Sequence, residues 1–277
     1  MNFGLLGHPV GHSVSPTMHA AWIRDAGLDA TYQAFEIDPS TPAHTVLAAA
    51  DARALTGFNL TVPFKERVLP VIAARGEVDA QARRIGAINT VCVRQGRLHG
   101  TNTDAPGFVA GVRERDPTLD RVVGRTVVVL GAGGAGRAVA VGLGQAGAAR
   151  VVILNRTVPR AEAVVRSLAD PSVYLAGSLE QFADWAPQAS LFAVAVSGPG
   201  QAAIASLDPA RVPRDALWVD LNYWSTEPPL WADLEARGIP LQDGLPMLIH
   251  QGALAFEAFT GRPADPESAR AALTNRR

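Results

Sequence analysis

Short apolar runs alternate with segments of helical periodicity along most of the chain. Three apolar or β-branched runs that end in loop residues predict strands, at residues 2–6, 31–37 and 54–60. Between the first two runs, Ser15 and Pro16 are typical of a helix N-cap and first turn, and Gly27 is typical of a helix end. A second helix is predicted over residues 43–50. Strands that alternate with helices predict a parallel sheet.

The same alternation returns in the second half of the chain. Further strands are predicted at residues 126–130, 150–154, 190–196 and 216–221. Helices are predicted at residues 105–121, 137–146, 161–168 and 246–259, the first of them as a connection between two regions. Two short strands precede that connection and turn at Gln95 and Gly96. The whole pattern predicts an α/β fold.

A glycine-rich motif links the strand at 126–130 to the helix that follows it. Residues 131–136 read GAGGAG, which is G-x-G-x-x-G between a strand and a helix, with a second strand after the helix. Gly131 permits a tight turn, Gly133 leaves room for a pyrophosphate, and Gly136 lets the helix pack closely. The unpaired N–H groups of the helix N-terminus favour phosphate. The motif therefore predicts a Rossmann-type dinucleotide site that includes Gly131, Ala132, Gly133, Gly134 and Ala135.

The residues after the strand at 150–154 bear on which dinucleotide binds. An NAD site commonly has a carboxylate here, which accepts from the ribose 2′-hydroxyl. This chain has Asn155, Arg156 and Thr157, with Arg160 shortly after. Because a guanidinium pairs with a phosphate and a carboxylate repels one, NADP is favoured over NAD.

Composition narrows the class of protein. The 277 residues are 48% hydrophobic and 18% charged, which suffices for a sizeable core, and the net charge of -1 predicts no nucleic-acid surface. The only cysteine, Cys92, excludes an intramolecular disulfide and favours a reducing cytoplasm. No membrane-spanning run or signal peptide is apparent, and the six histidines lack the spacing of metal ligands. The oligomeric state is predicted only as monomer or homodimer.

Polar residues follow several predicted strands. Ser13 and Ser15 lie at a helix N-terminus, which suits a carboxylate, although ordinary capping explains them equally well. Lys65 follows a strand end, where open α/β sheets bind ligands, although a lone lysine is usually only solvated. Three segments carry polar side chains that suit one shared polar ligand, namely Asn59, Thr61 and Lys65, then Asn89, then Asn102 and Asp104.

Six motifs in order make the chain resemble the shikimate dehydrogenase family over essentially its whole length. They are GHPVGHSVSP, NLTVPFK, GAINT, GTNTD, GAGGAGRA and DGLPMLIHQGALAFEAFTG. The resemblance implies reversible, NADP-dependent reduction of 3-dehydroshikimate to shikimate. It also implies a substrate domain of residues 1–104 plus 246–277, a Rossmann domain of residues 105–245, and an active-site cleft between them.

The resemblance assigns roles to individual residues. Lys65 and Asp104 are implied as the acid–base pair, and Ser13 and Ser15 as ligands of the substrate carboxylate. Ring hydroxyls are implied to contact Thr61, Asn89, Asp104 and Gln251, with Tyr223 as a further substrate residue. Asn59 is predicted as a substrate residue from the pattern of polar residues alone. The adenosine phosphate end is implied to contact Asn155, Arg156 and Thr157, and Leu221 and Gly244 close the cofactor side.

The chain departs from the family's usual pattern in three places. Residues 193–200 lack the usual Asn-Ala/Thr-Thr stretch, Trp224 and Ser225 replace Asn-Pro, and Ala20 follows His19 where Asn is usual. The first departure puts nicotinamide-side affinity in doubt. Two alternatives to a shikimate dehydrogenase stay open. They are a quinate or mixed quinate/shikimate dehydrogenase, and a binding module that has lost turnover. Ser15 and Arg156 favour shikimate and NADP, and the Lys65/Asp104 pair favours an enzyme.

Overall fold

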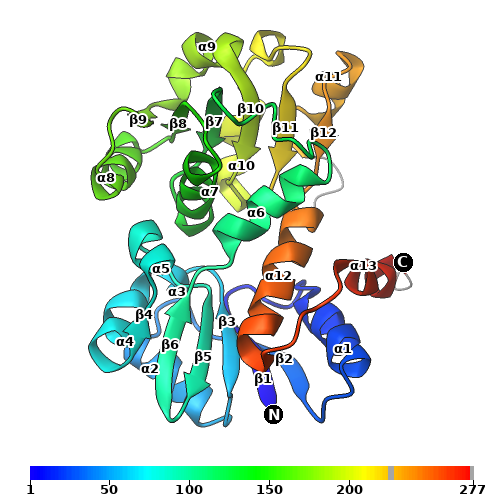
Figure 1. The fold of residues 1–277 in the computed structure, drawn as a ribbon. Helices are drawn as coiled ribbons and strands as arrows, with labels where there is room; N and C mark the ends of the chain where they lie inside the picture. Colours follow the sequence, from blue (N-terminus) through cyan, green and yellow to red (C-terminus); the bar gives the residue numbers. More distant parts are fainter. Residues whose placement is uncertain (224–227, 275–277) are drawn as a thin grey trace. The chain divides into compact units, whose positions relative to one another are not determined.

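The chain forms two compact units, each described here by itself. Unit 1 is Met1–Gly107 with Ile249–Arg277, and unit 2 is Phe108–Leu248. The structure is a computed structural model that describes residues 1–223 and 228–274. The chain passes between the units within two helices, α6 (Asp104–Arg113) and α12 (Leu245–Thr260) (Figure 1). Each unit is built on one six-stranded sheet, which confirms the predicted α/β class.

The sheet of unit 1 has the strand order β2-β1-β3-β5-β6-β4. The strands are β1 (Asn2–Gly7), β2 (Thr31–Glu36), β3 (Gly57–Leu60), β4 (Glu77–Val78), β5 (Thr90–Arg94) and β6 (Arg97–Thr101). β1 pairs in parallel with β2 and β3, and β4 with β6, whereas β3, β5 and β6 form an antiparallel meander. The sheet is therefore mostly parallel, as predicted, with an antiparallel hairpin inserted.

Helices cover both faces of this sheet. They include α1 (Ser15–Asp25), α2 (Ala43–Asp51), α3 (Phe64–Arg67), α4 (Leu69–Arg75) and α5 (Ala80–Ile85), and α13 (Pro266–Thr274) packs on α1. α2 to α5 bury Val46, Phe64 and Ile72 against Phe58 on one face. On the other face a Cβ at Gly57 would strike the Phe259 ring of α12, so the helix rests directly on the sheet.

Unit 2 has a fully parallel sheet with the order β12-β11-β10-β7-β8-β9. The strands are β7 (Thr126–Leu130), β8 (Arg150–Leu154), β9 (Tyr174–Gly177), β10 (Ala189–Val194), β11 (Leu217–Asp220) and β12 (Leu241–Gln242). Its helices are α7 (Gly134–Gln145), α8 (Val158–Leu168), α9 (Phe182–Trp185), α10 (Gln201–Ala205) and α11 (Trp231–Ala236), with 3-10 turns η1 (Leu179–Gln181), η2 (Ala186–Gln188), η3 (Gly198–Gly200) and η4 (Pro209–Arg211).

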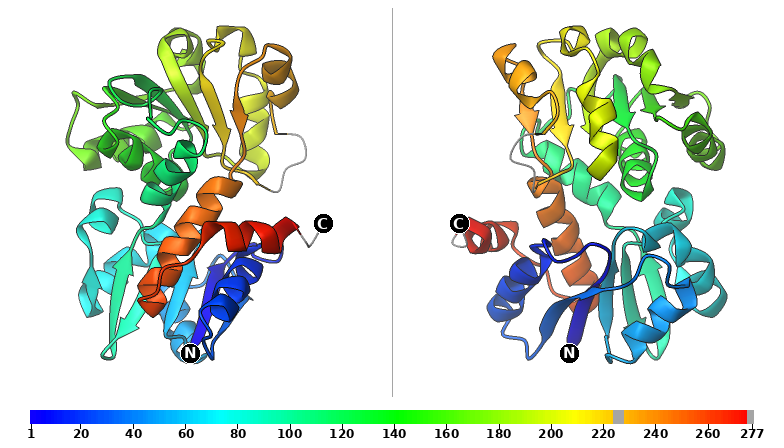
Figure 2. Two further views of the ribbon diagram at one scale, coloured as in Figure 1. Left: turned by 45° about the vertical axis from the view of Figure 1, so that its right-hand side comes forward. Right: turned by 180° about the vertical axis from the view of Figure 1, so that it is seen from behind.

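The central strands of unit 2 are buried on both sides, as a parallel sheet requires. Val128, Phe192 and Trp218 form a continuous core with Ile204 of α10 and Leu234 of α11 on one face of the sheet. α7 and α8 pack against β7, β8 and β9 (Figure 2). This doubly covered sheet explains why its strands read as unbroken apolar runs in the sequence.

Several predicted boundaries are wrong. The helix predicted over 105–121 ends at Arg113, because the Asp116 carboxylate accepts from the N–H groups of Asp120 and Arg121 and closes a turn there. The strand predicted from Ala54 begins only at Gly57, since Ala54 has a positive φ of 50°. The short elements α3, α4, α5 and β4 were not predicted, because none is long enough to show a period.

Within the described residues, no helix combines the length and the apolar character needed to cross a membrane.

Candidate functional site

Lys65 and Asp104 form an ion pair in unit 1. The Nζ atom of Lys65 lies 2.7 Å from Oδ2 of Asp104, and the two side chains are only 16% and 5% exposed. Lys65 stands in the single turn of α3 after β3, and Asp104 is the first residue of α6. Two oppositely charged groups that are so little exposed interact strongly, because water screens them poorly.

The β5–β6 hairpin explains why Asp104 lies beside the residues before β5. The hairpin turns at Gln95 and Gly96, both with positive φ, as predicted. Because Thr90 pairs with Thr101, the open end of the hairpin places Asn89 next to Thr103 and Asp104. Thus two segments that are apart in sequence meet at one end of the sheet.

Asn102 fixes the start of α6. Its Nδ2 donates to the carbonyl of Ala87, and its Oδ1 accepts from the backbone N–H of Asp104. The asparagine thereby closes a turn and places the Asp104 carboxylate at a helix N-terminus, where negative charge is favoured. Asn102 is 2% exposed, so both of its polar groups need these partners.

Asn89 is the centre of the polar cluster. Its Nδ2 donates to Oδ1 of Asp104 at 2.8 Å and to Oγ1 of Thr103 at 2.9 Å, with Oε1 of Gln251 at 3.3 Å. Its Oδ1 accepts from the N–H of Thr103 and the hydroxyl of Thr90. The predicted residues Lys65, Asn89, Asp104 and Gln251 are therefore brought together, and Thr90 and Thr103 join them although they were not predicted.

The two serines lie near the start of α1, but not as predicted. Ser15 is the first residue of α1, Val14 occupies the N-cap position, and no side chain caps the helix. Instead the Ser13 hydroxyl accepts from the N–H of Ser15 at 3.3 Å and donates to its hydroxyl at 3.2 Å. The prediction of Ser15 as N-cap is wrong by one residue, and the two hydroxyls lie side by side.

Asn59 lies within β3, and Thr61 directly follows the strand. Asn59 is 7% exposed, and its amide bonds to the Tyr32 hydroxyl, the Asn89 carbonyl and the Thr90 hydroxyl. These partners hold the Asn59 side chain within the sheet, and its predicted substrate contact stays a prediction. The Thr61 side chain is half-buried after β3, and its predicted contact with a ring hydroxyl stays a prediction.

The glycine motif of unit 2 has the local geometry that the sequence predicts. Gly131 has a φ of +116°, which L side chains rarely adopt, and a Cβ at Gly136 would overlap the Gly131 carbonyl. α7 begins at Gly134, and its first N–H groups lack partners within the helix. The backbone N–H of Ala132 donates to Oδ1 of Asn155 at 3.2 Å. Asn155 thus ties the end of β8 to the motif.

The arginines that were predicted for the phosphate end lie at the surface of unit 2. Arg156 and Arg160 are both exposed, and among the described residues neither guanidinium has a hydrogen-bond partner. Arg156 lines a hollow of about 430 Å³ together with Ser178 and Ala203. Arg156 is a cation at the carboxyl end of β8, which suits a phosphorylated ribose, and the carboxylates of Glu180 and Asp208 also line the hollow.

Three strand ends on the opposite half of this sheet are tied together. Asp220 at the end of β11 accepts from the backbone N–H and the Nδ2 of Asn222, and Nδ2 also donates to the Val196 carbonyl at 2.9 Å. Burial raises the pKa of Asp220. A Cβ at Gly244 would overlap the carbonyl of Leu221. Asn222 therefore holds the 193–200 segment, a role that sequence reasoning missed.

Two further features follow Asn222 in the sequence. Tyr223 is half-buried after β11 in unit 2, and its predicted approach to the substrate stays a prediction. Trp224 and Ser225, the second departure from the family pattern, lie outside the described residues.

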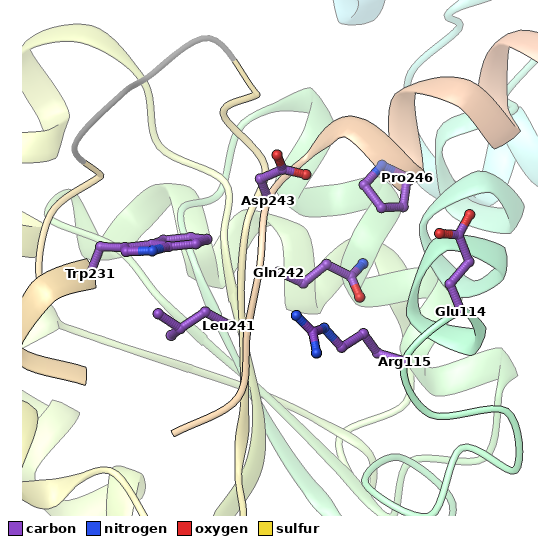
Figure 3. Close-up of a pocket in the computed structure, with 7 residues that line it drawn as sticks. All are labelled: Glu114, Arg115, Trp231, Leu241, Gln242, Asp243 and Pro246. Carbon is purple, nitrogen blue, oxygen red and sulfur yellow. The ribbon is translucent and has the colours of Figure 1, made fainter. Parts of the chain in front are cut away.

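A second hollow of unit 2, of about 520 Å³, borders the edge strand β12. Figure 3 shows Trp231 and Leu241 on one side of β12, and Gln242 and Arg115 on the other. The Nε2 of Gln242 donates to the Gly111 carbonyl at 3.1 Å, which ties the strand to α6. Asp243, the residue before Gly244, also lines this hollow.

Three family descriptions match successive parts of the chain. "Shikimate dehydrogenase substrate binding domain" matches residues 5–91, "Shikimate / quinate 5-dehydrogenase" residues 116–222, and "Shikimate 5'-dehydrogenase C-terminal domain" residues 244–274. A shikimate dehydrogenase (NADP(+)) of Thermus thermophilus is 41% identical, with 99% of both chains covered. The chain belongs to the shikimate dehydrogenase family.

Solved structures agree with this membership in the shikimate dehydrogenase family. The shikimate 5-dehydrogenase of Thermus thermophilus in complex with NADP(H) and shikimate matches with a TM-score of 0.80 at 37% identity, covering 99% of each chain. Quinate dehydrogenase from Corynebacterium glutamicum in complex with NAD matches with a TM-score of 0.85 at 28% identity, also covering 99% of each chain. The predicted family and two-domain fold class are therefore confirmed.

Proposed function

We propose that this chain is an NADP-dependent shikimate dehydrogenase that reduces 3-dehydroshikimate to shikimate, with Lys65 and Asp104 as the catalytic pair. The observation that carries the proposal is the buried contact of 2.7 Å between Lys65 and Asp104, surrounded by hydrogen-bonding side chains. Membership in the family supports an oxidoreductase that acts on a CH–OH group.

Lys65 has the chemistry that the reduction needs. Bound NADPH supplies a hydride to the ring ketone, and the resulting alkoxide must gain a proton. An ammonium is a proton donor that can return to the neutral amine, whereas a guanidinium cannot. We therefore assign the proton transfer to Nζ of Lys65, with Asp104 orienting and balancing the ammonium. In the oxidative direction the same amine accepts the proton from the substrate hydroxyl.

The other polar residues of unit 1 suit the remaining groups of the substrate. The adjacent hydroxyls of Ser13 and Ser15 are donors for a carboxylate. Asn89 and Gln251 lie around the catalytic carboxylate, and we assign them with Thr61 to the ring hydroxyls. A rigid, polar cluster of this kind discriminates strongly against analogues that leave one of its groups unpaired.

Unit 2 suits the cofactor. The turn at Gly131, the close packing at Gly136 and the start of α7 form a cradle for a pyrophosphate, and Arg156 suits the 2′-phosphate. We assign Ala132, Gly133, Gly134 and Ala135 to the pyrophosphate, and Asn155, Thr157 and Arg160 to the phosphate end. Leu221 and Gly244 are assigned to the nicotinamide side.

Quinate oxidation with NAD is the second candidate, because a quinate dehydrogenase in complex with NAD shares the fold over 99% of its chain. Steady-state rates with shikimate and with quinate, each with NADP and with NAD, separate the two. Shikimate with NADP should give the highest kcat/KM. A higher kcat/KM for quinate or for NAD would refute the assignment of Ser15 or of Arg156.

A cytoplasmic location is also proposed, and Cys92 supports it. This single cysteine is unpaired, and burial raises the pKa of its thiol to about 11, so it stays a thiol.

A further inference from the structure

Beyond Asn89, unit 1 contains a row of buried polar side chains on three strands of its sheet. Tyr32 of β2, Asn59 of β3 and Thr90 of β5 are 7%, 7% and 0% exposed. Antiparallel pairing sets Asn59 directly opposite Thr90, so the sheet register itself brings the two side chains together. Nothing in the reaction proposed above uses these three residues.

The orientation of Asn59 is determined by its partners. Its Nδ2 lies 3.1 Å from the backbone carbonyl of Asn89, which can only accept. The amide nitrogen must therefore face β5, and Oδ1 faces the Tyr32 hydroxyl at 2.9 Å, which must donate. The second hydrogen of Nδ2 is directed at Oγ1 of Thr90 at 3.0 Å.

The orientation of Asn89 is determined in the same way. Its Oδ1 lies 2.8 Å from the backbone N–H of Thr103, which can only donate. The Thr90 hydroxyl already accepts from Asn59, and it directs its own hydrogen to this oxygen at 2.9 Å. The Nδ2 of Asn89 is then left to donate to Oδ1 of Asp104 at 2.8 Å.

These bonds form one chain in which every donor points toward Asp104. We infer that Tyr32, Asn59 and Thr90 are positioning residues that hold Asn89 in the one orientation that donates to Oδ1 of Asp104 and leaves Oδ2 for Lys65. The inference rests on the proposed roles of Lys65 and Asp104. Hydrogen bonds in such a row polarise one another, so the chain also strengthens the final bond to the carboxylate.

The far end of the chain lies among aromatic rings, which keep its donor fixed. The Tyr32 ring stacks on the His19 ring with 3.9 Å between centroids, and Trp22 packs edge-on against His19. Burial raises the pKa of the Tyr32 hydroxyl and lowers the pKa of His19 to about 3. Tyr32 therefore remains a protonated donor, and His19 remains neutral, throughout the pH range in which the enzyme can work.

A substitution series at Thr90 tests the chain. Thr90→Val keeps the shape but removes the hydroxyl, and Thr90→Ser keeps the hydroxyl. We expect Thr90→Val to lower kcat roughly tenfold with the KM for NADPH unchanged, and Thr90→Ser to stay within about twofold of the parent. Tyr32→Phe, one bond further away, should lower kcat roughly threefold. Tyr174→Phe removes another buried tyrosine hydroxyl, in unit 2, and should leave kcat unchanged.

The double variant Tyr32→Phe/Thr90→Val gives the sharpest result. If the residues act in one row, Tyr32→Phe costs nothing further once the Thr90 hydroxyl is gone. Because Lys65 is the only lysine in the sequence, isotopically labelled lysine gives one side-chain resonance. That resonance should shift in Thr90→Val and stay in place in Thr90→Ser and Tyr174→Phe.

Three outcomes would overturn the inference. The first is an unchanged kcat in Thr90→Val, and the second is a fall in kcat in Thr90→Ser as large as that in Thr90→Val. The third is a double variant whose loss in kcat equals the product of the two single losses. Lys65→Ala is measured in parallel. If Lys65→Ala loses activity while Thr90→Val keeps it, only the chain is refuted. If Lys65→Ala itself keeps kcat, the proposed function fails and the inference with it.

Discussion

The candidate sites of the two units differ in whether side chains or backbone groups form them. In unit 1 the site consists of side chains that are buried and bonded to one another, with Asn89 joining Asp104, Thr90 and Thr103. In unit 2 it consists mainly of backbone, with a tight turn at Gly131 and the start of α7, and its charged side chains are exposed. A buried network loses much when one member is changed, whereas exposed groups act more independently.

The largest effect is therefore expected at Lys65. Lys65→Arg keeps a positive charge beside Asp104 but cannot release a proton, so kcat should fall by roughly 10²–10⁴ with little change in KM. Initial rates of shikimate oxidation measure this. Arg67→Gln, two residues later on the exposed side of α3, is the control and should keep full activity. A Lys65→Arg variant that retained kcat would show that Lys65 supplies charge and not a proton.

The composition contains a signal for this residue. The sequence has 25 lysine and arginine residues, and Lys65 alone is lysine. Apart from the histidines, every other basic side chain is arginine, and the only side-chain ammonium lies at the position that we propose as the proton donor. The signal is independent of the strand that precedes Lys65.

The second effect concerns the stability of unit 1 and arises from His19. The pKa of His19 is lowered to about 3 by burial, whereas an unfolded chain has a value near 6.5. Below pH 6.5 the unfolded state binds a proton at His19 that the folded state does not bind. The contribution of His19 to the free energy of unfolding is therefore full above pH 6.5 and is lost as the pH falls toward 3. By pH 4.5 the loss should reach about 3 kcal/mol.

Urea unfolding at pH 7 and pH 4.5 measures this linkage when the parent is compared with His19→Phe. The variant keeps a ring to stack on Tyr32 and should lose about 3 kcal/mol less between the two pH values. His44→Phe replaces an exposed histidine and should leave the difference between the pH values as in the parent. Equal losses in parent and His19→Phe would mean that His19 does not carry the linkage.

The third effect tests the backbone site of unit 2. A Cβ at Gly136 would overlap the Gly131 carbonyl, so Gly136→Ala must shift α7 or the turn. The substitution should lower the free energy of unfolding by about 1–3 kcal/mol and weaken NADP binding. At Gly133 a Cβ would meet no protein atom within 4 Å. Gly133→Ala should therefore keep the stability of the parent yet weaken NADP, as measured by thermal unfolding and calorimetric titration. If Gly133→Ala bound NADP normally, the pyrophosphate would not pass close to this residue.

The contrast between the units also explains what could be predicted from the sequence. The glycine motif was predicted in detail because Gly131 and Gly136 meet local backbone demands, such as the φ of +116° at Gly131. The catalytic pair was assigned only through the resemblance, since Lys65 and Asp104 meet through the β5–β6 hairpin and not through local spacing.

The residues that were missed belong to the same buried network. Thr90 and Tyr32 look like ordinary strand residues, and for Asn59 the sequence predicted a polar site but not these partners. Their partners depend on cross-strand register, which no local pattern contains. The pairing of a buried asparagine, Asn59, with a threonine, Thr90, in the neighbouring strand is the signal that could have identified them.

The smallest effect is expected at Arg156, because an exposed cation is screened by water and salt. Arg156→Gln should weaken NADP roughly tenfold and leave NAD unchanged, since only NADP carries the 2′-phosphate. The loss should shrink as ionic strength rises, unlike any loss at the buried pair Lys65 and Asp104. Arg166→Gln removes another exposed arginine, on α8, and should alter neither cofactor's KM. If Arg156→Gln weakened NADP and NAD equally, Arg156 would contact a part that the two cofactors share. Another residue would then have to select NADP, and Arg160 is the nearest arginine in the sequence.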